Sequence, residues 1–176
     1  LVRDRIFAHH YGAGDILDAY YAAFRIPDFL FNLLLAGALT AGFVPIFLEL
    51  WQKDPQKSWA LTNRILRVVA ITMTIAGIVG WLIAPYAVPY ITPGFSGEKL
   101  ALTIELTRIL MLSPLLMGVS GVLSGVLHAR RQFTAFAFAP LIYNLAIIGG
   151  VVFLVPHFGP IALAWGVVIG ALLHLL

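Results

Sequence analysis

The chain contains no cysteine among its 176 residues, which excludes disulfides, thiolate metal sites and cysteine catalysis together. Charge is also scarce, because Lys, Arg, Asp and Glu make up only 11% of the residues. A soluble globular domain carries roughly 25% charged residues to cover its surface. Hydrophobic residues instead reach 61%, and the mean hydropathy is +0.96. These values exclude a water-soluble globule and indicate a protein whose main solvent is lipid.

Long stretches without any charged residue mark the membrane segments. They cover residues 29–48, 68–97, 109–127 and 132–176, and the prolines and glycine of 156–160 divide the last one. Each membrane-spanning helix needs roughly 20 apolar residues. We therefore predict an all-α, polytopic transmembrane bundle of about six helices. The predicted helices cover residues 1–9, 16–51, 58–88, 100–128, 133–155 and 161–176.

The ends of the chain suggest a piece of a longer protein. The sequence has no initiator methionine, and it stops inside an apolar run without a helix cap. We expect residues 1–176 to form a single transmembrane domain, part of a lobe, whose first and last helices are truncated.

Basic residues are unevenly distributed between the loops. Six of them follow the second and fourth predicted helices: Lys53, Lys57, Arg64, Arg67, Arg130 and Arg131. The opposite side has only Lys99. By the positive-inside rule, the loops around 52–67 and 128–132 are predicted to be cytoplasmic.

Another group of charges lies inside the predicted helices near the start of the chain: Arg3, Asp4, Arg5, Asp18, Arg25 and Asp28. At 1.5 Å per residue, Arg3 lies about 13 Å below the turn at Gly12, and Arg25 lies about 15 Å below Asp15. Half of the hydrocarbon core is also about 15 Å thick. A charge at that depth costs about 2.5 to 3.5 kcal/mol and usually faces a bundle interior or a wet cavity.

The spacing in the second predicted helix favours such a cavity. Asp18, Arg25 and Asn32 are seven residues apart and share one face. Arg3 and Arg5 are about 200° apart on a helix, so only one of them can point at that face. A buried guanidinium stays charged and suits phosphate. These residues together predict a carrier with a cationic cavity for an anionic ligand.

Simpler interpretations of the same charges remain open. Arg3 with Asp4, and Arg25 with Asp28, can be neutralised pairs that only hold helices together. Asp18 can satisfy backbone donors in the first turn of a helix that Asp15 caps. Elsewhere, Glu105 and Arg108 have the spacing of an i, i+3 ion pair.

Other functional classes find little support in the residues. No nucleophile elbow, HExxH motif or metal-ligand spacing is present, so we expect neither an enzyme nor a metal or cofactor site. The scattered net charge of +3 argues against nucleic acid. A noncatalytic membrane scaffold remains a competing interpretation.

Several short motifs occur in a familiar order along nearly the whole chain. They are Val2-Arg3-Asp4, Tyr11-Gly12-Ala13-Gly14, the run DAYYAAFRIPD at 18–28, Gly37-Ala38-Leu39, Phe43-Val44-Pro45-Ile46-Phe47, Pro93-Gly94-Phe95, Arg131-Gln132-Phe133, Phe138-Ala139-Pro140 with Asn144, and Leu163-Ala164-Trp165-Gly166. In these motifs the chain resembles the MurJ (MviN) lipid II flippases of the MOP exporter superfamily.

The resemblance implies a transporter of two lobes and fourteen helices in the bacterial inner (plasma) membrane, of which this chain would be most of the first six helices. Such a protein moves the undecaprenyl-pyrophosphate-linked peptidoglycan precursor to the outer leaflet by alternating access. Its partners would be this lipid, membrane lipids and the missing C-terminal lobe. In the resemblance, Arg3 matches an arginine that lines the family's central cavity and engages the pyrophosphate, Arg25 matches a basic position on the second helix, and Asp18 matches an acidic position at its outer end. From their shared depth and face, we expect Arg3 and Arg25 to bind the pyrophosphate, and Asp18 and Asn32 to shape or gate the outer half of the path. Asp4 and Asp28 complete the predicted substrate-binding residues.

The chain departs from the family pattern in two places. Many members have an Arg-Arg pair where this chain has Phe31-Asn32, and a glutamate where it has Ala36. Two interpretations fit these departures. The chain belongs either to a divergent flippase, which we favour, or to an exporter of another polyprenyl-linked saccharide or of drugs.

Overall fold

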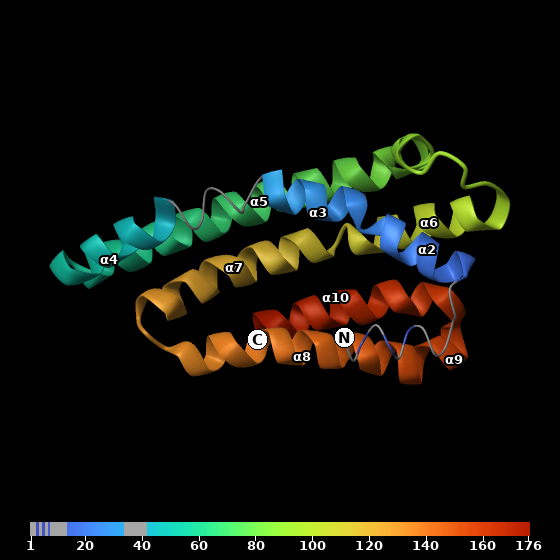
Figure 1. Ribbon diagram of the computed structural model, residues 1–176. Coiled ribbons are helices and arrows are strands. Elements are labelled where there is room, and N and C mark those ends of the chain that lie inside the picture. Colours follow the sequence, from blue (N-terminus) through green and yellow to red (C-terminus); the bar gives the residue numbers. More distant parts are fainter. Residues whose placement is uncertain (1–2, 4, 6, 8–13, 34–41) are drawn as a thin grey trace.

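The computed structural model describes residues 3, 5, 7, 14–33 and 42–176, apart from the side chains of 133–136, and within these residues every element is helical (Figure 1). The all-α prediction is confirmed. The α-helices are α2 (Asp15–Ala23), α3 (Arg25–Phe31), α4 (Val44–Lys53), α5 (Pro55–Ile91), α6 (Gly97–Leu110), α7 (Ser113–Ala129), α8 (Phe133–Gly149), α9 (Val155–Phe158) and α10 (Ala162–Leu175). A π-helical turn, η3 (Gly150–Leu154), continues α8, and a short 3-10 turn, η4 (Gly159–Ile161), precedes α10.

Three helical runs in the described residues are long and apolar enough to cross a membrane: Pro55–Ile91, Gly97–Ala129 and Ala137–Leu175. The third run folds back on itself at Gly159, whose φ of 68° lies in the left-handed region that glycine adopts without steric cost. As a result α8 and α10 lie side by side and antiparallel (Figure 1). This turn agrees with the division predicted at 156–160.

The helices form three layers. The α6–α7 pair lies in the middle, with α5 packed on one side and α10, backed by α8, on the other (Figure 1). α2 packs against α6, α3 against α7, and α4 against both α5 and α7.

Two of the predicted helices are interrupted in the structure. The segment predicted as one helix at 16–51 contains α2, α3 and α4, with a turn at Phe24 between the first two. The helix predicted at 100–128 is α6 and α7, joined at Met111 and Leu112. Pro114 lies in the first turn of α7, where its missing N–H leaves no helical hydrogen bond unmade. Ser113 Oγ donates to the Leu110 carbonyl at 2.7 Å and so satisfies an acceptor at the break.

Two clusters of buried apolar side chains hold the layers together. The first joins α2, α6, α8 and α10 around Phe7, Tyr20, Leu106 and Leu163. The second joins α4 to α7 through Phe43, Phe47, Val122 and Val126. Most of α5, in contrast, exposes large apolar side chains, such as Ile71 at 60% and Ile75 at 58%. An exposed apolar surface of this extent is what a lipid-facing helix requires.

Candidate functional site

Arg3 and Asp28 are brought to the same part of the molecule. Arg3 lies in a helical segment and is half-buried, and Asp28 lies in the first turn of α3. Tyr143 of α8 is within electrostatic range of both charges. Asp28 and Tyr143 also line one cavity of about 150 Å³ between α3, α7 and α8. Three segments that are far apart in the sequence therefore bring a cation and a carboxylate within electrostatic range of one phenol, and the carboxylate and the phenol lie on a cavity whose other lining residues are mostly apolar.

Arg25 makes a different contact. Its Nη1 donates to the carbonyl oxygen of Ile91, the last residue of α5. The C-terminus of a helix carries partial negative charge on its unpaired carbonyls, so a guanidinium is stabilised there. No ion pair joins Arg25 to Asp28 in the part of the chain that the structure describes. Arg25 thus ties α3 to the end of α5.

Asp18 takes part in a charged cluster between α2 and α6. Lys99 Nζ lies 2.6 Å from Asp18 Oδ2 and 2.8 Å from Asp15 Oδ1, and it also sits 4.3 Å from the centre of the Phe95 ring. The expectation that Asp15 caps the second helix is wrong, because Gly14 is the N-cap residue and no side chain caps this helix. Both carboxylates are used by Lys99 instead.

The remaining predicted site residues can be placed only in part. Asn32 is exposed, and its Nδ2 donates to the backbone carbonyl of Asp28 at 2.8 Å, so its amide group lies one helical turn after Asp28. Asp4 lies outside the described residues, as does Ala36, one of the two departures from the family pattern. Arg5 is exposed.

The i, i+3 pair predicted for Glu105 and Arg108 is not formed. Arg108 Nε donates to the Trp81 carbonyl at 3.3 Å, and the guanidinium carbon lies 4.6 Å from the centre of the Trp81 ring. Trp81 lies on α5, which packs against α6. The spacing of Glu105 and Arg108 within α6 could not predict that Trp81 of α5 would be the partner of Arg108.

Tyr143 was not singled out by the sequence reasoning. A polar aromatic residue beside Asn144, in an otherwise apolar segment, is the signal that was available. Phenol and guanidinium groups both donate hydrogen bonds to oxyanions, so Tyr143 adds a neutral donor next to Arg3.

Comparison with known proteins decides the family. A family model described as "Lipid II flippase MurJ" matches residues 7–176. The chain belongs to the MurJ lipid II flippase family. Like other MurJ family members, it is a multi-pass protein of the bacterial inner membrane.

The chain is similar to individual MurJ proteins over its whole length. It is 34% identical to the lipid II flippase MurJ of Burkholderia cenocepacia, over 100% of this chain and 35% of that protein. It is 32% identical to a probable lipid II flippase MurJ of Buchnera aphidicola subsp. Acyrthosiphon pisum, over 99% of this chain and 35% of that protein. The chain therefore spans about a third of the length of these MurJ relatives.

A solved MurJ structure has the same arrangement of helices. This lipid II flippase MurJ, in an inward closed conformation, matches with a TM-score of 0.82 and 25% identity, covering 99% of this chain and 37% of the other. The MurJ fold expected from the sequence is therefore confirmed, and the shared arrangement includes both the α5–α7 layers and the α8–α10 hairpin.

Proposed function

We propose that the full-length protein containing this chain flips the lipid-linked peptidoglycan precursor, lipid II, from the inner to the outer leaflet by alternating access. The observation that carries this proposal is the match of the family model to residues 7–176. It is supported by Arg3, which lies within electrostatic range of Tyr143, a phenolic donor that lines the cavity together with Asp28. In this proposal the chain forms most of the first lobe and works with a second, C-terminal lobe.

Each polar residue has a role in this proposal. Arg3 and Arg25 bind the pyrophosphate, which a planar guanidinium can contact through two parallel hydrogen bonds. Asp28 and Asn32 contribute polar groups near the arginines, and Asp4, which lies outside the described residues, is a further candidate for substrate binding. Asp18, held by Lys99, shapes the outer end of the path by keeping α2 against α6.

The first test is genetic, in a bacterium depleted of its own flippase. We expect Arg3→Ala in the full-length protein to abolish complementation, with normal expression, because the anion loses its main charged ligand. Arg5→Ala is the matched control, since Arg5 is exposed and lies about 200° around the helix from Arg3. Normal growth of the Arg3→Ala strain would refute the proposed role of Arg3.

The departure at Phe31-Asn32 favours one alternative, an exporter of a different polyprenyl-linked saccharide or of drugs. Labelling lipid II at the outer leaflet distinguishes it. Depletion of the full-length protein should remove the labelled lipid II if lipid II is the substrate, and should leave it unchanged if another compound is carried.

The other alternative is a noncatalytic membrane scaffold. It requires Arg3 and Arg25 to be dry. This chain contains no cysteine, so a single cysteine at either position reports access directly once any cysteine in the rest of the full-length protein has been replaced. We expect it to react with water-soluble thiol reagents in a flippase, and to resist them in a scaffold. In either case we propose a protein without enzymatic activity or cofactor, with the loops around 52–67 and 128–132 in the cytoplasm.

A further inference from the structure

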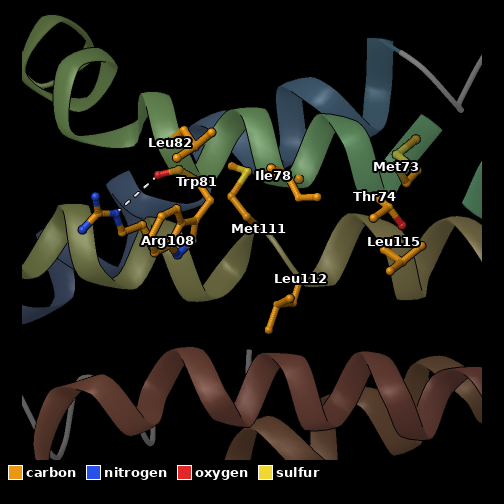
Figure 2. Close-up of a pocket in the computed structure, with 10 residues that line it drawn as sticks. Met73, Thr74, Ile78, Trp81, Leu82, Arg108, Met111, Leu112 and Leu115 are labelled. Carbon is orange, nitrogen blue, oxygen red and sulfur yellow. Dashed lines mark hydrogen bonds between the residues drawn. The ribbon is translucent and has the colours of Figure 1, made fainter. Parts of the chain in front are cut away.

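A second opening is separate from the cavity that Asp28 and Tyr143 line between α3, α7 and α8. It is a cleft of about 340 Å³ between α5 and α6–α7, and we call it the α5–α7 cleft (Figure 2). This volume is within the range of roughly 300–1,000 Å³ that is common for small-molecule sites. The walls are almost entirely apolar, with main contributions from Met73, Ile78, Leu82, Met111 and Leu115.

The cleft has a single cation, Arg108, at one end. The Trp81 ring and the Trp81 carbonyl hold the guanidinium by a cation–π contact and one Nε hydrogen bond. Figure 2 shows the two terminal nitrogens of Arg108 pointing away from the other side chains that line the cleft. Within the described ranges, no carboxylate lies within ion-pair distance of Arg108. The positive charge and the terminal donors therefore lie at the edge of the cleft, on a partly exposed side chain.

The surroundings specify the chemistry of an occupant. A cation inside an apolar helix is costly unless an anion or water reaches it. Long basic side chains in membrane helices extend toward the nearer interface. Arg108 follows this pattern, because it leans along α6 toward the turn between α5 and α6 (Figure 2). A phosphate on the guanidinium would sit at that end, and the apolar walls beyond it offer room only for hydrocarbon.

We propose that the α5–α7 cleft binds one anionic phospholipid, with its phosphate on Arg108 and one acyl chain along the apolar walls toward Met73 and Leu115. The proposal goes beyond substrate transport, because the cleft does not include any residue of the proposed substrate path. Basic pockets between transmembrane helices are known to hold anionic lipid headgroups.

The molecule provides its own comparison site. An apolar cleft of about 260 Å³, lined by Leu154, Phe158, Ala162, Trp165 and Ile169, contains no charged residue. It offers hydrocarbon contacts of the same kind without a cation. If Arg108 determines the lipid headgroup, only the α5–α7 cleft distinguishes anionic from zwitterionic lipids.

The test is native mass spectrometry of the purified full-length protein with phosphatidylglycerol or phosphatidylcholine of identical acyl chains. We expect the wild-type protein to retain phosphatidylglycerol in preference to phosphatidylcholine. Arg108→Gln should reduce that preference about tenfold or more, the range expected for a lost charge-assisted hydrogen bond. Arg108→Lys should keep most of it, since the charge remains. Ile169→Trp, in the comparison cleft, should leave the preference unchanged.

A second variant keeps the test independent of the arginine. Ile78→Trp fills the α5–α7 cleft and should reduce the binding of phosphatidylglycerol while the protein still elutes as a single species. The proposal is overturned if Arg108→Gln retains the wild-type preference for phosphatidylglycerol, or if Ile78→Trp binds as much phosphatidylglycerol as the wild-type protein. It is also overturned if the wild-type protein retains neither lipid, which would mean that another part of the polypeptide or a second copy covers the cleft.

Discussion

The contact between Gly150 and Gly166 offers the sharpest test of the packing. A Cβ atom added at Gly150 would lie 2.8 Å from the Gly166 Cα, where the α8–η3 segment crosses α10. Carbon atoms prefer separations of about 3.5–4.0 Å. The obstacle is backbone rather than a movable side chain, so the two helices must separate by up to about 1 Å if Gly150 becomes alanine. Overpacking of this kind costs about 1–3 kcal/mol.

The measurement is the apparent melting temperature of the full-length protein in detergent, followed by loss of the monodisperse species. A domain of 150–250 residues shifts by about 2–4 °C per kcal/mol, and a larger unit shifts by less. Because this chain is about a third of the length of its relatives, Gly150→Ala should lower the melting temperature of the full-length protein by less than about 12 °C. Gly149→Ala is the matched control, because the nearest atom to its added Cβ is Phe153 Cδ2 at 4.0 Å. This control should melt at the wild-type temperature or slightly above it, since alanine is the better helix former.

A graded result would strengthen the reasoning. At Gly166 the added Cβ would meet the Gly150 Cα at 3.2 Å, a milder overlap, so Gly166→Ala should cost less than Gly150→Ala. If the Gly150→Ala and Gly149→Ala variants melt at the same temperature, the close approach of the Gly150 and Gly166 backbones does not contribute to stability.

Two further predictions concern charged residues at the ends of helices. Asp54 caps α5 by accepting two backbone N–H groups, and these hydrogen bonds, that of Lys57 first, hold the pKa of Asp54 below its ordinary value. The Asp54 carboxylate therefore stabilises the first turn of α5 fully at pH values above the ordinary carboxyl pKa. This stabilisation is lost as the pH falls through the lowered pKa of Asp54 in the folded protein. Hydrogen exchange of the Gln56 and Lys57 amides should accelerate in Asp54→Ala at neutral pH, but not in Asp54→Asn, because asparagine can still cap the helix. Equal exchange rates in the two variants would contradict the capping role of Asp54. Lys99→Met should weaken the contact between α2 and α6 and lower the melting temperature. Adding Asp18→Asn to Lys99→Met should lower the melting temperature only a little further, because the two residues share one ion pair. Fully additive losses would show that the ion pair contributes nothing.

The sequence was sufficient for the features that depend on composition and on local chain geometry. The scarcity of charge indicated the membrane, and the prolines and glycine at 156–160 located the hairpin that Gly159 makes. Both signals are local: the prolines lack a backbone donor, and Gly159 adopts a positive φ that ends the helix. Proline alone does not end a helix in this protein, since Pro85 and Pro89 lie inside α5 and Pro140 lies inside α8.

Features that depend on which helix lies opposite could not be derived in the same way. The partner of Arg108 is the indole of Trp81, 27 residues earlier, and the partner of Arg25 is the carbonyl of Ile91, 66 residues later. Pairing of charges within one helix was the only geometry that spacing could suggest. Tyr143 was missed for the same reason, since its relevance arises from its position beside Arg3 and Asp28.

The cluster of Lys99 with Asp15 and Asp18 also bears on how the protein is held in an energised membrane. With the proposed orientation, the six basic residues at 53–67 and 130–131 face the negative interior, while the one outer lysine is bound by two carboxylates. Moving a unit charge across the membrane against the potential costs about 2.3 kcal/mol per 100 mV. The resting voltage therefore opposes inversion of the basic loops. The outer cluster of one lysine and two carboxylates carries a formal net charge of −1, so the same voltage also favours keeping this cluster on the outer side. In this arrangement the membrane potential itself helps to keep the helices in one orientation.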